Sequence, residues 1–285
     1  MLIPFTLIIG ETYASFPFYF KGKPVVLIKN NPAPSCLISN RKAGDMIFRL
    51  SNQQPPGTNK NREVFFSTLG IPAEKVYSLF QIHSRNVFLP GNLPGSKHAL
   101  SIPLVLPEIF AQEGDGMVSF FSGLYLAVTV ADCLPVFLLD TENGFFAVLH
   151  SGWKGTGIVT NALEIMKKAG SRPEMISAVL GPCIQSCCYK VNEERAKNFE
   201  LEFGLASSKS DAVDPDRFPL GPVIRSGSSG WYISLQAANA RLLAAAGVQN
   251  IAYCTDCTFT DTRLGSFRRE GESYTRMIAM AGNIP

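Results

Sequence analysis

Short runs of β-branched and aromatic residues recur along the chain and outnumber its helical patterns. Such runs are typical of strands buried in a folded core. The helical patterns do not alternate strictly with these runs, as they would in a doubly wound parallel sheet. We therefore expect an α+β fold rather than a Rossmann-type fold.

The predicted elements follow from these periodicities and from capping residues. The predicted strands are Pro24–Ile28, Met46–Leu50, Val76–Ile82, Leu124–Val130, Val136–Leu139, Phe145–His150, Ile176–Leu180, Asn250–Cys254 and Met277–Met280. The predicted helices are Asn61–Leu69, Ile158–Met166, Glu193–Phe203 and Leu235–Ala246, the last capped by Ser234 and ended by Gly247. Segments rich in Pro, Gly and Ser are predicted surface loops: Asn52–Asn59, Leu89–Pro107 and Ser207–Ser229. None separates stretches of different composition, so we expect one domain over residues 1–285.

The composition excludes several classes of partner. The net charge is only +3, and no cluster of Lys and Arg or known nucleic-acid module occurs, so we expect no nucleic-acid partner. Met1–Gly10 is apolar but lacks a positively charged start and is too short to span a bilayer. We therefore expect no membrane association. Seven cysteines, an odd number, suit a reducing compartment, and we expect the cytoplasm.

One pair of motifs points to chemistry. Cys133 lies in Ala131-Asp132-Cys133-Leu134-Pro135, and His150 follows 17 residues later, after an apolar run. A thiol and an imidazole at the ends of neighbouring strands can form a nucleophile–base pair or bind a metal. The glycine-rich turn after His150 leads into a predicted helix. It suits either an anion-binding helix start or a tight turn that lets helix pack on strand.

Only two other histidines occur. His98 lies in a predicted loop, whereas His83 ends a predicted strand. His83, Cys133 and His150 would form a three-ligand zinc site with an open fourth position, as in catalytic zinc centres. From spacing alone, strand-end histidines beside a core cysteine are an equal alternative.

Other polar residues are candidates for supporting roles. Asp115 and Asp132 lie near the predicted metal ligands, where a carboxylate can transfer protons or orient a ligand histidine. Arg268, in an Arg-Arg-Glu run, is a candidate phosphate ligand. The remaining cysteines also suggest a structural zinc site, although their spacing departs from known zinc patterns. They are Cys183, Cys187, Cys188, Cys254 and Cys257.

Taken together, these motifs resemble the laccase-domain family of the YfiH type, also called multicopper polyphenol oxidase-like proteins. The resemblance extends from about His83 to the C-terminus. The segments that carry it are Phe80-Gln81-Ile82-His83, Gly114-Asp115-Gly116-Met117-Val118, Thr129-Val130-Ala131-Asp132-Cys133-Leu134-Pro135, His150-Ser151-Gly152-Trp153-Lys154-Gly155, Leu180-Gly181-Pro182-Cys183-Ile184 with Cys187-Cys188-Tyr189, and Ser266-Phe267-Arg268-Arg269-Glu270-Gly271.

The resemblance implies a single α+β domain with mixed β-sheets between helical layers, like the deamidase domain of cytotoxic necrotising factors. It implies that His83, Cys133 and His150 bind zinc. It further implies phosphorolysis of adenosine, inosine, guanosine and methylthioadenosine, and deamination of adenosine. Older descriptions of the family give a copper-dependent phenol oxidase, and bacterial relatives are linked to editing of peptidoglycan precursors.

The chain departs from the family pattern at several positions. The family's Gly-Trp-Arg-Gly is Gly152-Trp153-Lys154-Gly155 here, which replaces a bidentate guanidinium with a point charge. The N-terminal third, about residues 1–75, is divergent. The usual Gly-Gly-Val-Ser is Ala43-Gly44-Asp45-Met46, and the Asn-Leu pair is Arg49-Leu50. The following Asn61-Arg62 is retained.

Our leading hypothesis is a zinc-dependent purine nucleoside enzyme, active as a monomer or small homo-oligomer on small-molecule substrates. Arg62 or Lys154 would position phosphate, and Asp115 and Asp132 would support the metal ligands or transfer protons. Three hypotheses remain beside it. The first is a copper oxidase, which would need more than three histidines. The second is a metal-free hydrolase, which would use Cys133 as nucleophile and His150 as base. The third is a non-catalytic protein that binds a partner and has no turnover.

Overall fold

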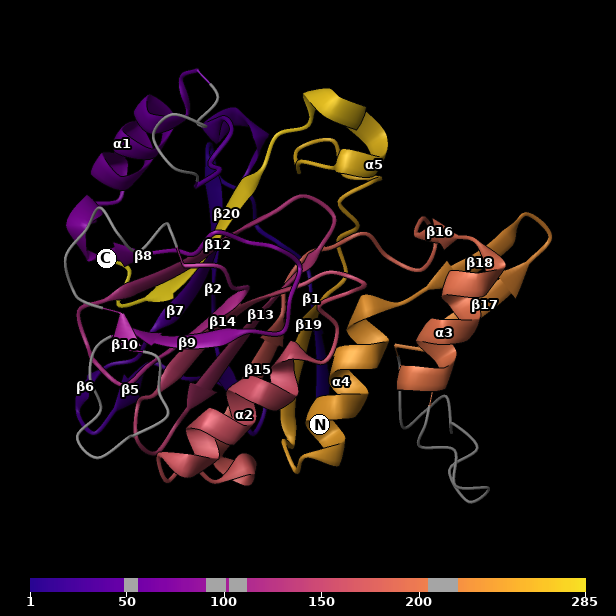
Figure 1. Cartoon of the computed structure of the whole chain (residues 1–285). Helices are drawn as coiled ribbons and strands as arrows, with labels where there is room; N and C mark the ends of the chain where they lie inside the picture. The colour runs from indigo at the N-terminus through magenta and orange to yellow at the C-terminus, as the bar shows by residue number, and fades with distance from the viewer. Residues whose placement is uncertain (49–55, 91–100, 103–111, 205–219) are drawn as a thin grey trace.

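The structure is a computed structural model that describes residues 1–48, 56–90, 101–102, 112–204 and 220–285. Two β-sheets are stacked face to face, and a helical layer covers each outer face (Figure 1). Helix α1 (Thr58–Thr68) covers the smaller sheet, and α2 (Ile158–Lys168) and α4 (Leu235–Ala245) cover the larger one. The expected α+β class, with β-sheets between helical layers, is confirmed.

The larger sheet mixes parallel and antiparallel neighbours in the order β1-β19-β15-β13-β14-β11-β9-β10. Its strands are β1 (Leu2–Phe5), β9 (Val87–Pro90), β10 (Ser101–Ile102), β11 (Gly116–Ser119), β13 (Leu134–Asp140), β14 (Phe146–Ser151), β15 (Ile176–Leu180) and β19 (Asn250–Cys254). The central strand β13 runs antiparallel to both of its neighbours, β14 and β15, and β14 also runs antiparallel to β11.

The smaller sheet has the order β2-β7-β20-β12-β8. Its strands are β2 (Tyr13–Pro17), β7 (Ser35–Ser39), β8 (Val76–Tyr77), β12 (Tyr125–Val130) and β20 (Met277–Gly282). The C-terminal strand β20 pairs with β7 on one side and β12 on the other. The C-terminal strand therefore lies inside this sheet, whereas β1 at the N-terminus pairs with β19 in the larger sheet. That residues 1–285 form one domain with a divergent N-terminal third stays a prediction.

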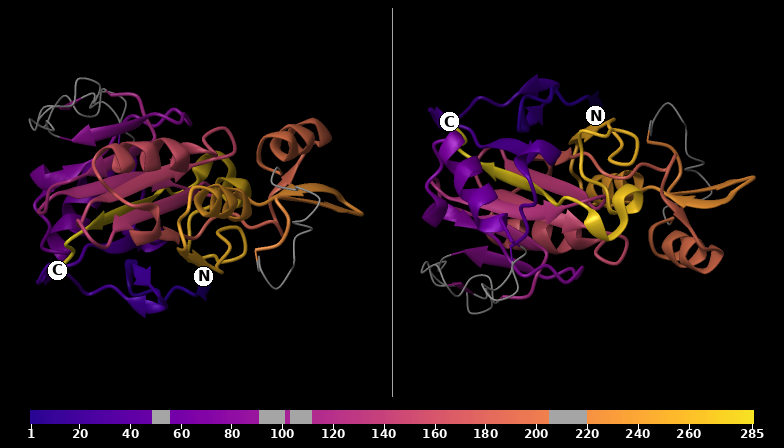
Figure 2. Two further views of the ribbon diagram at one scale, coloured as in Figure 1. Left: turned by 90° about the horizontal axis from the view of Figure 1, so that it is seen from below. Right: turned by 90° about the horizontal axis from the view of Figure 1, so that it is seen from above.

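Smaller elements lie outside the two sheets. They are the hairpins β3 (Tyr19–Phe20) with β4 (Lys23–Pro24) and β5 (Leu27–Ile28) with β6 (Asn31–Pro32), the sheet of β16 (Lys190–Val191), β17 (Ile224–Gly227) and β18 (Gly230–Ile233), and helices α3 (Glu193–Phe203) and α5 (Phe267–Glu270). Figure 2 shows α3 and the sheet β16-β18-β17 projecting together from one end of the molecule.

The core follows from the alternation of side chains along the strands. In β13, Val136 and Leu138 pack toward α2 and α4, whereas Phe137 and Leu139 pack between the two sheets. All four are fully buried. Burial of each such side chain stabilises the fold by about 1.5–3 kcal/mol. A strand buried on both faces explains why the sequence of β13 is uniformly apolar.

The predicted helices are confirmed, with ends shifted by a few residues. Ser234 caps α4, since its hydroxyl accepts a hydrogen bond from the backbone N–H of Ala237 at 3.1 Å. Such a cap contributes about 1 kcal/mol. Gly247 follows α4 with φ 94°, a conformation that favours glycine. Among the described residues, no helix is long and apolar enough to cross a membrane.

Several predicted boundaries are wrong. Residues 46–48 are not a strand, because Met46 and Phe48 pack against α1 without pairing to a sheet. Their apolar side chains are buried, and this apolar run led to the wrong prediction of a strand. Only Val76–Tyr77 of the predicted strand Val76–Ile82 is a strand. The predicted loops at 89–107 and 207–229 overlap the strands β9, β10 and β17. His98 and the pair Arg49-Leu50 lie outside the described residues.

Candidate metal centre

Three side chains from distant segments converge at one end of the stacked sheets. A ring nitrogen of His83, the Sγ of Cys133 and a ring nitrogen of His150 lie within 4.8 Å of one another. The two imidazole rings are 4.9 Å apart and meet edge to face at 74°. His83 is exposed, Cys133 is half-buried and His150 is buried. The group is therefore anchored in the core and open to solvent on the His83 side.

The sheet topology brings these residues together. Cys133 lies in the turn by which the chain passes from β12 in the smaller sheet to β13 in the larger one. Pro135 of β13 pairs with His150 of β14, so the turn and His150 are neighbours. Asp132 and His83 have φ angles of 82° and 61°. These left-handed conformations cost free energy in residues other than glycine. Such strained conformations are common at functional sites.

Asp115 contacts both histidines through its carboxylate. Its Oδ1 lies 2.8 Å from Nδ1 of His150 and accepts the backbone N–H of His83 at 3.0 Å. Its Oδ2 accepts the hydroxyl of Ser84 at 2.7 Å. Asp115 is fully buried, and these donors compensate the loss of water. A carboxylate on Nδ1 leaves Nε2 of His150 as the ligand atom, which is the usual support of a metal-binding histidine.

The charges of Cys133 and His150 are coupled. Burial opposes the thiolate, but the neighbouring His150 and His83 outweigh it and lower the pKa of Cys133 to about 6. Burial also opposes the imidazolium, but Cys133 and Asp115 raise the pKa of His150 to about 10. These opposite shifts favour the thiolate form of Cys133 and the imidazolium form of His150. A thiolate is the form of cysteine that binds metals and the form that acts as a nucleophile.

Glycines leave room for this group. A Cβ on Gly152 would lie 2.9 Å from Sγ of Cys133 and 3.2 Å from Cδ2 of His83. A Cβ on Gly155 would lie 2.9 Å from the carbonyl oxygen of Ser84. These close approaches favour the tight-turn interpretation of the glycine motif.

Two imidazoles and one thiolate with a side open to solvent fit zinc, which binds N and S ligands and keeps an open position in catalytic centres.

His83, Cys133 and His150 line a pocket of about 420 Å³. That volume suits a nucleoside-sized ligand. The aromatic residues of its wall are Trp153, Tyr189, Phe267 and Tyr274, and the arginines are Arg195, Arg268 and Arg276. Aromatic faces can stack on a planar base, and guanidinium groups can bind phosphate in a bidentate manner.

Two of these arginines lie over aromatic rings. The guanidinium of Arg195 is 4.2 Å from the ring centroid of Trp153, and that of Arg268 is 5.3 Å from the ring of Tyr189. Among the residues that the structure describes, neither arginine has a carboxylate partner. Their charge is therefore available to an anion in the pocket.

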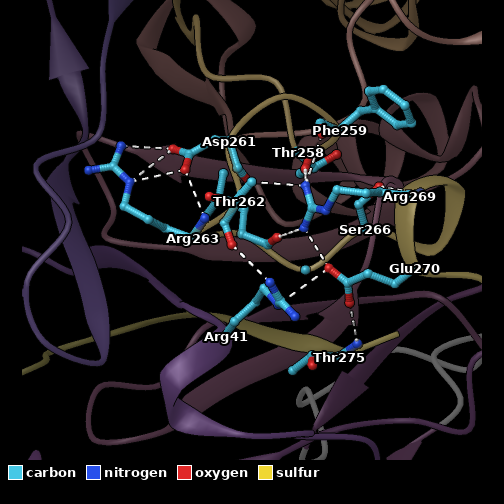
Figure 3. Close-up of polar contacts among 12 residues, drawn as sticks. Arg41, Thr258, Phe259, Asp261, Thr262, Arg263, Ser266, Arg269, Glu270 and Thr275 are labelled. Carbon is cyan, nitrogen blue, oxygen red and sulfur yellow. Dashed lines mark hydrogen bonds and ion pairs between the residues drawn. The ribbon is translucent and has the colours of Figure 1, made fainter. Parts of the chain in front are cut away.

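Asp132 supports the turn that carries Cys133. Its Oδ1 accepts the hydroxyl of Thr258 at 2.7 Å, and its Oδ2 accepts the backbone N–H of Arg268 at 2.7 Å. Figure 3 shows the neighbouring Arg269, whose guanidinium donates to backbone carbonyls of the segment 258–264 and so fixes the segment that contacts Asp132. Both oxygens of Asp132 already have donors, which favours support of the turn over proton transfer.

Two predicted phosphate ligands lie outside the pocket wall. Lys154 is exposed, with its ammonium 5.5 Å from the ring centroid of Trp153. Arg62 donates to the carbonyl of Ile47, which does line the pocket, and its guanidinium lies 4.6 Å from the ring of Phe48. Arg62 therefore contacts the pocket through Ile47 rather than directly. The structure brings Arg268 to the pocket, and the roles of all these residues stay predictions.

The sequence reasoning missed Arg195, Arg276 and Tyr274. Arg195 lies in the first turn of α3, and Arg276 precedes β20, where it pairs with Asp45. Neither lies in a motif, and both reach the pocket only through tertiary packing. The short Arg268–Arg276 spacing beside aromatic residues is the one signal in the sequence that could have indicated this wall.

Comparisons with known proteins show similarity in sequence and in fold. The profile of the family described as multi-copper polyphenol oxidoreductase laccase matches residues 49–283. A purine nucleoside phosphorylase of Corynebacterium glutamicum is 30% identical over 219 residues, which are 76% of this chain and 78% of that protein. Adenosine deaminase RL5, from an unknown prokaryotic organism, is 34% identical over 179 residues, 58% of this chain and 62% of that protein. The crystal structure of YlmD from Geobacillus stearothermophilus has a TM-score of 0.74 at 22% identity, over 96% of this chain and 97% of that one, so the two folds agree.

Proposed function

The chain belongs to the family of the multi-copper polyphenol oxidoreductase laccases, and from this premise we propose that it is a zinc-dependent purine nucleoside enzyme. Its reactions are phosphorolysis of adenosine, inosine, guanosine and methylthioadenosine, and deamination of adenosine. Relatives that carry the names purine nucleoside phosphorylase and adenosine deaminase support this assignment.

One observation carries the proposal. The group of His83, Cys133 and His150 lines a pocket whose wall combines aromatic rings with arginines, two of which have no carboxylate partner among the described residues. A purine nucleoside needs a flat apolar contact for its base, and phosphate needs guanidinium donors. Both needs are met within the same 420 Å³.

The chain's own residues have distinct tasks in this proposal. A zinc ion bound by the three side chains would supply Lewis acidity at its open position. Asp115 fixes the ring of His150, and Asp132 fixes the turn of Cys133. Arg195 and Arg268 orient phosphate so that one oxygen forms a bond to the anomeric carbon of ribose. The bond between that carbon and the base breaks, and the base leaves with the electron pair and takes up a proton.

The copper oxidase that the family description suggests fits this chain less well. Electron transfer through several copper centres needs many imidazole ligands, and the chain has three histidines. Two of these lie in the mixed N and S group described above.

A metal-free cysteine hydrolase is a second candidate, and the lowered pKa of Cys133 favours it. In that mechanism Cys133 would attack the substrate, His150 would transfer the proton, and His83 would be dispensable. A covalent adduct on Cys133 in active, metal-free protein would identify this activity.

Product analysis tests the proposed reactions directly. Zinc-loaded protein is incubated with inosine, with and without phosphate. We expect hypoxanthine and ribose 1-phosphate in equal amounts, and only when phosphate is present. Adenosine without phosphate should yield inosine. Absence of all these products, or release of free ribose independent of phosphate, would contradict the proposal.

All seven cysteines are free thiols, which supports our proposal of a reducing compartment, the cytoplasm.

A further inference from the structure

A second cluster of metal-ligating side chains lies outside the candidate metal centre. The Sγ atoms of Cys187, Cys188 and Cys257 lie within 4.8 Å of one another. None of the three lines the 420 Å³ pocket. Cys187 is exposed, Cys188 is half-buried and Cys257 is buried. The cluster therefore has an anchored thiol and an accessible side, as the candidate metal centre does.

Two backbone segments hold the thiols together. Cys183 and Cys257 form an isolated parallel bridge, which aligns the turn 184–189 with the segment that follows β19. Within the turn, the backbone N–H of Cys188 donates to the carbonyl of Gln185 at 2.9 Å. Cys187 and Cys188 are left with their Sγ atoms 3.2 Å apart. The cluster is therefore set by the fold rather than by the chance approach of mobile side chains.

The backbone also supports a negative charge on the third thiol. The N–H of Gln185 donates to Sγ of Cys257 at 3.4 Å. An N–H aimed at sulfur favours the thiolate, which is the form that binds metals. This contact comes from the same turn that carries Cys187 and Cys188, so it joins Cys257 to that turn.

Metal ions can reach the cluster from solvent. Cys187 and Cys257 both line a pocket of about 710 Å³ that is separate from the candidate metal centre. Two carboxylates line the same pocket but already have partners. Asp256 accepts the backbone N–H of Leu7 at 2.7 Å, and Asp261 forms an ion pair with Arg263 at 2.8 Å.

These contacts define the chemistry of the site. Its donors are sulfur only, because no histidine is among them and the nearby carboxylates have other partners. Thiolates select soft ions such as Cu(I) and Zn(II). Structural zinc takes four ligands, whereas the cluster supplies three. A three-sulfur donor set, to which the described part of the chain adds no fourth ligand, therefore favours Cu(I).

We propose that Cys187, Cys188 and Cys257 form a second metal site, which binds one Cu(I) ion through three thiolates. The site is independent of the proposed nucleoside chemistry. It also has a structural consequence: Thr258, next to Cys257, donates to Asp132, which is next to Cys133. The segment of Cys257 is thus joined by one hydrogen bond to the turn that carries Cys133.

Anaerobic Cu(I) titration tests the proposal. Reduced protein competes with bicinchoninate for Cu(I), in a Cys133→Ala background that removes the candidate metal centre. We expect Cys133→Ala protein to bind one equivalent of Cu(I), with sulfur as the only ligand by X-ray absorption. Adding Cys257→Ser or Cys187→Ser should abolish this equivalent. Because Cys187 is exposed, its variant keeps the test valid if Cys257→Ser fails to fold.

The matched control is Cys36→Ala in the same background, since it also removes one thiol but lies in β7, in the core between the sheets. It should retain the equivalent of Cu(I). No Cu(I) binding by Cys133→Ala protein, or the same stoichiometry after Cys257→Ser and Cys187→Ser, would overturn the proposal. Equal affinity of the site for Zn(II) would overturn its assignment to Cu(I).

Discussion

Oδ1 of Asp115 lies 2.8 Å from Nδ1 of His150, and both side chains are buried, at 0% and 4% exposure. This contact fixes the orientation of one predicted metal ligand from within the core. Because the same oxygen accepts the backbone N–H of His83, one carboxylate positions two of the three ligands.

Asp115→Asn tests this relationship. The amide cannot accept all the hydrogen bonds that the carboxylate accepts, and it carries no charge to stabilise a basic imidazole. We expect zinc affinity to fall about 10–100-fold, as for other residues that orient metal-binding histidines. A chromophoric chelator competition measures it.

Asp140→Asn is the matched control for this variant. Asp140 is also fully buried, and it accepts backbone N–H groups of its own turn at the far end of β13. It should destabilise the fold without changing zinc affinity. Equal loss of affinity in both variants would show that Asp115 acts through general stability alone.

Gly152→Ala should damage the metal centre from the opposite side. Its Cβ would lie 2.9 Å from Sγ of Cys133, closer than carbon and sulfur pack without displacement. We expect zinc content of the purified variant to drop while the secondary structure stays native by circular dichroism. Gly227→Ala, where the nearest atom would be 3.8 Å away, should keep its zinc. Full zinc occupancy in Gly152→Ala would contradict the role given to this glycine.

Arg195→Ala and Lys154→Ala separate the pocket arginines from the exposed lysine. Arg195 lines the pocket and has no carboxylate partner in the described part of the chain, whereas Lys154 is exposed outside it. Loss of a charged hydrogen bond to phosphate costs about 1.5–3 kcal/mol, or roughly a 10- to 150-fold higher KM for phosphate in Arg195→Ala. Lys154→Ala should change this KM less than about twofold. The reverse order of effects would assign phosphate binding to Lys154.

Because of Asp261, the free energy of unfolding should depend on pH. The hydrogen bond and charge of Arg263 lower the pKa of Asp261, although partial burial opposes this. A pKa lower in the folded than in the unfolded chain stabilises the fold above the unfolded value, and this stabilisation is lost as the pH falls through the folded value. Arg263→Ala should therefore be less stable than the wild type at neutral pH, and the difference should shrink at about pH 3. Urea unfolding at both pH values measures it, and a difference that does not shrink would contradict the account.

The sequence predicts the metal centre better than it predicts the pocket wall. Cys133 and His150 lie at strand ends, and stacked sheets bring strand ends together. His83 was predicted to end a strand but lies in the segment between β8 and β9, which also reaches this end of the sheets. Arg195 and Arg276 could not be predicted in the same way, because α3 and the start of β20 reach the pocket only through the packing of distant segments. Local pattern carries no information about that packing.

In the fold, too, local sequence patterns predicted some elements and missed others. The core strand β13 was predicted from its apolar run, and α4 from its cap and its terminal glycine. Met46 and Phe48 are buried without joining a sheet, so their apolar character indicated burial but not strand pairing. Strand β17 was missed because most of its side chains are exposed in the projecting sheet and show no alternation.

Metal dependence of nucleoside turnover tests the central claim most directly. Wild-type, His83→Ala and Cys133→Ala proteins are stripped of metal, assayed for phosphorolysis of inosine, and assayed again after addition of one equivalent of zinc. We predict no turnover without metal, recovery with zinc in the wild type, and no recovery in either variant. Equal release of hypoxanthine by metal-free and zinc-loaded wild-type protein would contradict the account.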